Sequence, residues 1–286
     1  MTLLSIIFVL TIERYYRVLD EYRKLSWFTR WSLWVREHRE LDSRLSGWVI
    51  SLLTLLVPVL LVHQLAQWMA DGGWLPELLF GMLILILSLG PRDLREQVES
   101  VLESWSSEDL EGGILHAEGL LDGELPEEKR GLIRKLTEAV LTEANPRIFG
   151  VLFWFLTVGP AAALLFRLAR ILEERQMGGE DEPPLLLVKM NHLLAWPAAH
   201  LLALSYALVG DFSSAFRRIV EHAGDWSRNH AVMRQAGVGA IRLDDPLAES
   251  DEDLQEVWDA LEIVRRAEVA WVALMALLVL VGSIHT

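Results

Sequence analysis

Residues 46–70 read SGWVISLLTLLVPVLLVHQLAQWMA and contain no Asp, Glu, Lys or Arg. A helix needs about 20 mostly apolar residues, at about 1.5 Å each, to cross a bilayer core of roughly 30 Å. Four later windows are similarly apolar, and the N-terminus is a weaker sixth. We therefore predict an all-α fold, a polytopic membrane helical bundle with a single domain over residues 1–286. Its membrane segments are expected at about 1–19, 46–70, 74–91, 148–168, 190–210 and 269–286.

The overall composition also favours a membrane protein. Hydrophobic residues make up 52% of the 286-residue chain and the mean hydropathy is +0.29, although the net charge is −14. Charged and apolar residues must therefore be separated into different segments. The acidic balance argues against a nucleic-acid partner, because neutralising phosphates requires clustered Lys and Arg. The absence of Cys excludes disulfides, thiolate metal sites and Cys nucleophiles.

The distribution of Lys and Arg predicts the orientation of the chain in the membrane. Many Arg residues lie in 20–45 and again in 211–268, so the positive-inside rule places both regions in the cytoplasm. The turn at 71–73 has no Lys or Arg and is expected outside, which returns the acidic region 92–147 to the cytoplasm. These three regions are predicted to be helical, and both termini are predicted to lie outside.

Three tryptophans in the first cytoplasmic region share one helical face. Trp27, Trp31 and Trp34 are separated by four and three residues. This spacing fits an interfacial membrane anchor beside basic residues. It fits equally well a helix packed onto the bundle, and the sequence leaves both interpretations open.

A run of small residues lies inside the segment predicted at 148–168. It reads Gly159-Pro160-Ala161-Ala162-Ala163. Small residues let membrane helices approach closely, whereas a proline bends the helix and frees a carbonyl group. Close helix packing is the main expectation, and a pocket beside the freed carbonyl is the alternative.

Signatures of metal, cofactor and soluble-enzyme sites are absent from the sequence. There is no phosphate loop, no H-E-x-x-H, no G-x-S-x-G and no pair of His at i and i+4. The acidic residues between 244 and 253 lack the spacing of a calcium loop and are expected to be a solvated helix cap. The sequence thus predicts no metal, no cofactor and no catalytic residue.

The most informative polar residues lie where a cytoplasmic helix is expected to become a membrane helix. Glu143, Asn145 and Arg147 fall within about one turn there, and ionisable groups at that depth are costly unless they are paired or functional. Arg147 reaching the surface with Glu143 as its partner is the simple interpretation. Together with His192, these residues form the candidate ligand-binding site.

Several stretches of the chain resemble the AmpE family of inner-membrane proteins. They are Leu141–Trp154 followed by Leu156–Leu168, Leu193–Leu201 followed by Tyr206–Asp211, and Met1–Leu4 with Glu13-Arg14. AmpE proteins are in turn similar to the CobD/CbiB-type adenosylcobinamide-phosphate synthases, which attach an aminopropanol unit to a cobalamin precursor. The resemblance implies a regulatory or sensory role linked to β-lactamase induction and cell-wall recycling, in response to antibiotics.

The motif acids of the synthases are missing from this chain. Where those enzymes have Glu-Asn-x-x-Asp-Gly, this chain places Glu143 at the Asn, Pro146 at the Asp and Arg147 at the Gly. The synthases also carry acidic residues where this chain has Lys189–His192. We therefore expect a non-enzymatic membrane regulator. Its partners would be membrane lipid and a small-molecule or protein ligand on the cytoplasmic side, and a homo-oligomer is left open. The alternative is an active CbiB-like membrane synthase that forms an amide bond in cobamide-type chemistry.

Overall fold

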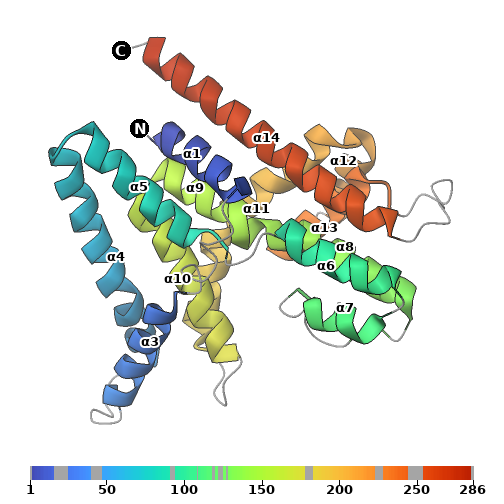
Figure 1. Ribbon diagram of the computed structural model, residues 1–286, viewed down its shortest axis with the longest axis horizontal. Coiled ribbons are helices and arrows are strands. Elements are labelled where there is room, and N and C mark those ends of the chain that lie inside the picture. Colours follow the sequence, from blue (N-terminus) through green and yellow to red (C-terminus); the bar gives the residue numbers. More distant parts are fainter. Residues whose placement is uncertain are drawn as a thin grey trace. The chain divides into compact units, whose positions relative to one another are not determined.

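The computed structural model describes most of the chain. The described residues are 2–15, 25–39, 47–90, 94–107, 109–117, 120–121, 125–126, 128–177, 183–222, 228–243 and 254–284. Every regular element in these ranges is helical, as Figure 1 shows, which confirms the all-α prediction. The acidic residues at 244–253 lie outside the described residues.

Contacts within the chain group it into two compact units. The first unit comprises Met1–Pro91 and Gly150–Trp196, and the second comprises Arg92–Phe149 and Pro197–Thr286. Each unit is described separately below. The boundaries predicted for membrane and cytoplasmic regions remain predictions.

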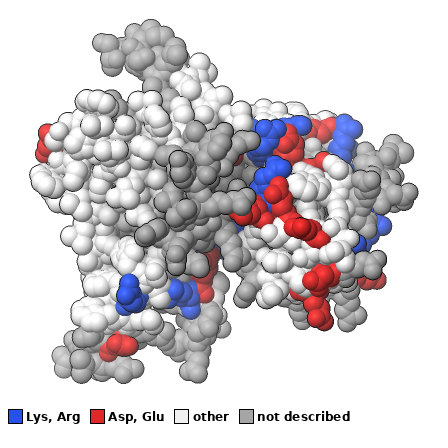
Figure 2. Space-filling model, in the orientation of Figure 1, with Lys and Arg blue, Asp and Glu red and all other residues white. Residues whose placement is uncertain are grey.

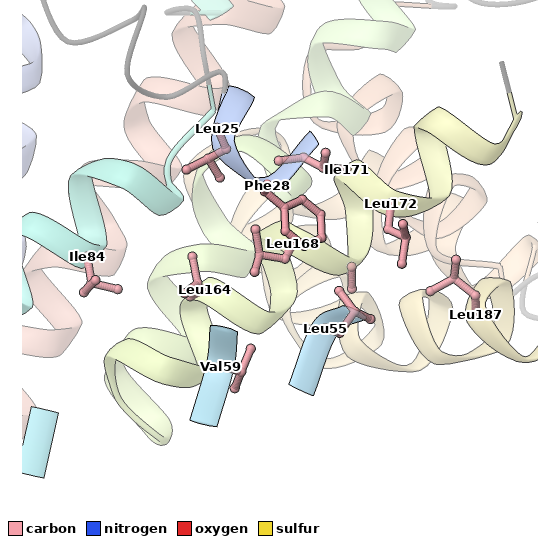
Figure 3. Packing of buried hydrophobic residues seen from close by; sticks show 11 residues of the cluster. Leu25, Phe28, Leu55, Val59, Ile84, Leu164, Leu168, Ile171, Leu172 and Leu187 are labelled. Atoms are coloured by element: carbon pink, nitrogen blue, oxygen red, sulfur yellow. The ribbon is translucent and has the colours of Figure 1, made fainter. Parts of the chain in front are cut away.

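The first unit is built from seven helical pieces, counted over its described residues. They are α1 (Thr2–Tyr15), α3 (Ser26–Arg39), α4 (Gly47–Asp71), α5 (Trp74–Ser88), α9 (Gly150–Thr157), α10 (Pro160–Met177) and the first part of α11 (Leu185–Val209). Helix α10 is central, because it packs against α4, α5 and α9. Figure 3 shows Leu164, Leu168 and Leu172 of this helix among Phe28 of α3 and Leu55 of α4. This cluster is the core of the first unit.

Two helices are long and apolar enough to cross a membrane. They are α4, over Trp48–Asp71, and α11, while α5 is apolar but shorter. Most of the apolar part of α4 is not covered by protein: Leu61 and Trp68 are 61% and 66% exposed. A helix that is apolar on all sides and still exposed is suited to lipid rather than water. The structure therefore supports two spans, and the expectation of about six is not confirmed.

The turn predicted at residues 71–73 joins α4 to α5. The Gly73 N–H donates to the Ala70 carbonyl at 3.2 Å, and Gly73 has a φ of 106°. Glycine adopts this backbone conformation without steric cost, whereas a residue with a Cβ atom would be strained in it. The sequence thus predicted this helical hairpin correctly.

The segment predicted at 148–168 is not one continuous helix. Helix α9 ends at Thr157, Gly159 has a φ of +113°, and α10 starts at Pro160. Proline suits the first position of a helix because its missing N–H would have no helical partner there. A Cβ atom at Gly159 would meet nothing within 4 Å. Gly159 therefore serves backbone conformation at a helix break, whereas Ala163 of the same run is fully buried, as close packing predicts.

Helix α3 supports one of the two interpretations of its tryptophans. The Trp31 indole N–H donates to the Thr54 carbonyl of α4 at 3.1 Å, and the Trp31 and Trp34 rings stack with centroids 5.4 Å apart. Trp27 and Trp34 remain half-exposed. Packing onto the bundle is thus established for Trp31, whereas the role of an interfacial anchor stays a prediction.

The second unit contains the charged helices. They are α6 (Leu94–Ser106), α7 (Leu110–His116), α8 (Lys129–Ala144), the π-helical turn η2 (Asn145–Phe149), the rest of α11, α12 (Phe212–Glu221), α13 (Asn229–Ala240) and α14 (Gln255–Ile284). Helix α14 packs against α8 through an apolar stripe that includes Val257, Leu261 and Val264. In Figure 2 the surface over α4 and α5 is almost entirely white, whereas charged atoms gather over the helices of the second unit.

Candidate functional site

The predicted site coincides with a distortion of the helix that leaves α8. Pro146 has no N–H and cannot donate to the carbonyl of Thr142, so the N–H of Asn145 donates to that carbonyl instead. The helix then widens into the π-helical turn η2. Single π-helical turns within helices are uncommon and occur frequently at functional sites. The local backbone therefore marks the position that the polar residues had indicated.

Arg147 is the centre of a polar cluster that joins three helices. Its Nε lies 3.4 Å from Glu143 Oε2, and its Nη1 donates to Gln97 Oε1 at 3.0 Å. The Gln97 Nε2 in turn donates to the His116 carbonyl at 3.0 Å. The side chains of Arg147 and Glu143 are only 12% and 17% exposed. We call Gln97, Glu143 and Arg147 the Arg147 cluster.

The Arg147 cluster contains a guanidinium, a group that can bind anions. A guanidinium presents several N–H donors in one plane and binds carboxylates or phosphates with two parallel hydrogen bonds. Glu143 and Gln97 fix the orientation of Arg147 through Nε and one Nη. Because the guanidinium of Arg147 is partly buried, its electrostatic interactions are screened less by water than those of a surface arginine.

Asn145 faces the interior of the second unit. Its side chain is buried, unlike those of Glu143 and Arg147. Aromatic side chains support the surrounding turn: the Tyr206 hydroxyl donates to the Leu141 carbonyl at 2.9 Å, and the rings of Phe149 and Trp271 meet edge to face. The predicted pair of Glu143 and Arg147 is confirmed, whereas the ligand role of Asn145 remains a prediction.

The fourth predicted residue, His192, lies in the first unit and is exposed. Its neighbour Asn191 is buried instead, and the Asn191 Nδ2 donates to the Ala169 carbonyl at 2.8 Å and to Glu173 Oε2 at 2.7 Å. Successive residues of a helix point about 100° apart, so only one of the two can face α10. The ligand role of His192 remains a prediction.

Glu173 and Asn191 form a second polar cluster, which the sequence analysis missed. Their exposed fractions are 6% and 8%. Buried carboxylates are rare unless they are paired or functional. The signal was weak, because Glu173 stands beside Glu174 and Arg175 at what looked like the polar end of a segment. A polar Asn191 next to an apolar run was the only hint of a buried partner.

Comparisons with known proteins identify the family of this chain. Residues 11–246 match the family described as "CobD/Cbib protein". The "Cobalamin biosynthesis protein CobD" of Chromobacterium violaceum is 28% identical over 243 residues, which cover 77% of this chain and 78% of that protein. The protein of the same name from Stutzerimonas stutzeri is 28% identical over 203 residues, 68% of this chain and 64% of its own length. No solved structure matches the chain.

These findings correct the functional expectation drawn from the sequence. Family and relatives point to cobalamin biosynthesis, which agrees with the alternative interpretation and contradicts a non-enzymatic regulator of β-lactamase induction. The AmpE assignment is not supported. The expectation rested on motif acids missing from two stretches of the chain, at Pro146 and at Lys189–His192, and the family match outweighs their absence. The chain belongs to the CobD/CbiB family.

Proposed function

We propose that this chain is a membrane synthase of cobalamin biosynthesis that forms an amide bond between a carboxyl group of a cobalamin precursor and the amine of an aminopropanol unit. The observation that carries the proposal is the family match over residues 11–246, together with two relatives named as cobalamin biosynthesis proteins. The two buried or half-buried polar clusters supply residue types that such a reaction needs.

Amide formation sets clear requirements on the site. The amine nitrogen attacks the carboxyl carbon, loses a proton, and the carboxyl oxygen leaves with an activating group supplied by a phosphoryl donor. A carboxylate is needed to hold the ammonium form and accept its proton, and a cation is needed beside the anionic substrate groups. Both kinds of group occur among the described residues.

Within the second unit, the Arg147 cluster is a separate candidate for binding an anionic group. Arg147 would bind a carboxylate or phosphate, while Glu143 and Gln97 hold the guanidinium in place, as their contacts at 3.4 and 3.0 Å suggest. Arg147 itself lies in the π-helical turn, which positions its backbone. The role of this cluster would be to bind and orient the anionic group, rather than to transfer a proton.

We assign the amine to the carboxylate of Glu173. The described contact of this carboxylate is the neutral amide of Asn191, so its negative charge is available to an ammonium group. Asn191 also bonds to the Ala169 carbonyl and is thereby fixed in orientation. A buried carboxylate is well suited to take up a proton when the amine reacts.

For the membrane arrangement we propose a multi-pass protein of the bacterial inner membrane with six segments, of which α4 and α11 are the strongest. Because the natural sequence has no Cys, single cysteines report topology directly. Cysteines at positions 36 and 228 should react only from the cytoplasm, and a cysteine at 179 only from outside. Reaction of position 228 from outside would contradict the proposed six-segment arrangement.

The proposed activity can be tested by complementation. A bacterial strain that lacks its own adenosylcobinamide-phosphate synthase should grow on cobalamin-dependent medium when it expresses this chain. Arg147→Leu and Glu173→Gln should abolish that growth at unchanged membrane levels, whereas Glu174→Gln, at the exposed neighbouring position, should retain it. Failure of the natural chain to support growth, despite normal amounts in the membrane, would contradict the proposal.

A further inference from the structure

Helix α12 carries an apolar stripe that no described part of the protein covers. Phe212, Phe216 and Val220 are 51%, 50% and 56% exposed. They follow one another at every fourth position and therefore share one face of the helix. The rings of Phe212 and Phe216 stack with centroids 5.5 Å apart, so the stripe is continuous. Two exposed phenylalanines on a short helix are unfavourable in water.

The opposite side of α12 is held firmly by α13. A Cβ atom at Gly239 would lie 2.6 Å from the Ala215 Cα, so the two helices touch at backbone distance. Asp211 caps α12 by accepting from the Ser214 N–H at 2.7 Å, and it binds Arg242 Nε at 2.7 Å. These contacts fix the rotation of α12 about its own axis. The exposure of the stripe is thus a property of the fold rather than of a loosely attached helix.

The position of α12 in the chain indicates what covers the stripe. It starts at Phe212, three residues after the span-capable helix α11 ends at Val209. The last turns of α11 also expose Leu204 and Leu208. Where a membrane helix ends, the chain is at the level of the lipid headgroups, and an amphipathic helix beginning there can lie in that interface.

The third side of α12 is polar and fits the same environment. Ser213, Arg217 and Glu221 are exposed on it. Arg217 follows Phe216 directly, so its guanidinium can reach headgroup phosphates while the neighbouring ring enters the acyl region. Contact with a protein partner would not require α12 to combine an apolar face, a basic face and a packed face next to the end of a membrane helix.

We propose that α12 is an interfacial helix that anchors the second unit to the bilayer surface. Phe212, Phe216 and Val220 insert among the lipid chains, and Ser213, Arg217 and Glu221 face water and headgroups. Part of the region 211–268, expected from sequence to be fully cytoplasmic, is therefore in contact with lipid. The inference concerns attachment to the membrane and does not depend on the proposed reaction.

The test uses the natural absence of Cys. Single cysteines replace Phe212, Phe216 and Val220, and matched ones replace Ser213, Arg217 and Glu221. Each full-length variant is spin-labelled and reconstituted into vesicles of phosphatidylcholine and phosphatidylglycerol. Oxygen, which concentrates in lipid, and a water-soluble nickel chelate then compete to relax the nitroxide. We expect the oxygen-to-nickel ratio to be several-fold higher at 212, 216 and 220 than at 213, 217 and 221.

Two results would overturn the proposal. Equal and high access of nickel at all six positions would show that α12 lies in water. Immobile nitroxides at 212, 216 and 220, reached by neither reagent, would show that protein covers the stripe. Activity of the variants is measured in parallel but decides neither outcome, so loss of the proposed reaction cannot be mistaken for loss of membrane contact.

Discussion

In the first unit the longest helix, α4, exposes leucine and tryptophan side chains, whereas in the second unit α6 and α14 expose arginine and glutamate. The ion pairs Arg95–Glu99 and Arg265–Glu262 lie at the surface of the second unit. The first unit instead hides its polar contact between Asn191 and Glu173. The two units thus differ in the kind of side chain that they present to their surroundings.

This difference shows where function is to be sought in each unit. Exposed ion pairs contribute only about 0 to 1 kcal/mol to protein stability and are common on any surface. The charges of α6 and α14 therefore say little about function. A buried carboxylate or a half-buried guanidinium needs a specific reason to persist. That criterion selects Arg167 and Glu173 in the first unit and Arg147 in the second.

The interior and the exterior of the first unit should respond very differently to the loss of an aromatic ring. Phe28 is fully buried in the core shown in Figure 3, while its neighbour Trp27 is 43% exposed. Phe28→Ala should lower the free energy of unfolding by about 3 to 5 kcal/mol. Trp27→Ala should change it far less. Equal losses in detergent denaturation would show that the face carrying Trp27 is also packed against protein.

Substitutions at two adjacent residues of α11 should also differ in their effect on stability, because only one of the two makes a buried polar contact. Asn191→Leu removes the donor to Glu173 and leaves a buried carboxylate unsatisfied, which should cost about 1 to 3 kcal/mol. His192→Leu alters an exposed side chain and should stay within about 0.5 kcal/mol. Thermal unfolding of the purified variants measures both. A stable His192→Leu protein without activity would restore His192 to the candidate site.

Replacing one glycine of the second unit by alanine should destabilise the protein, the opposite of the usual result inside a helix. Replacing glycine by alanine inside a helix normally stabilises a protein by about 0.5 to 1 kcal/mol. At Gly239 the added Cβ would meet the backbone of Ala215, so Gly239→Ala should destabilise by about 1 to 3 kcal/mol. Hydrogen exchange should show the loss at α12 and α13 first. Unchanged exchange there would mean that these helices do not touch as described.

Acidification should loosen the start of α12. The Ser214 N–H and then Arg242 stabilise the Asp211 carboxylate and lower its pKa from 3.8 to about 2. A carboxylate with a lowered pKa stabilises the fold above its unfolded pKa, and this contribution is lost as pH falls from about 4 to about 2. Amide exchange at the start of α12 should therefore rise over that interval. Asp211→Asn should remove this pH dependence, and persistence of the same transition in that variant would exclude Asp211 as its cause.

Sequence reasoning succeeded for features that depend on neighbouring residues. The apolar stretch at 46–70 became α4, and the glycines after Asp71 became the turn to α5, because both follow from local composition and backbone preference. The pair Glu143–Arg147 was also predictable, since four residues along a helix bring side chains together.

Features that depend on distant residues were not predictable in this way. Gln97 reaches Arg147 across 50 positions, and Asn191 reaches Glu173 from another helix. Gly159 was misread because a small residue suits both close packing and an unusual backbone conformation, and only coordinates separate the two. The functional expectation failed because it relied on acids missing from two short stretches, whereas the family is shown by similarity along most of the chain.

The most direct test of the proposed function is product formation by the purified protein. The natural chain and Glu173→Gln are reconstituted into lipid vesicles and supplied with the cobalamin precursor, the aminopropanol substrate and a phosphoryl donor. Mass spectrometry then follows the amide product. We predict product with the natural chain and a loss of at least about a hundredfold with Glu173→Gln, the size typical of removing a group that takes part in proton transfer. Absence of product with the natural chain, or an undiminished rate with Glu173→Gln, would contradict the account.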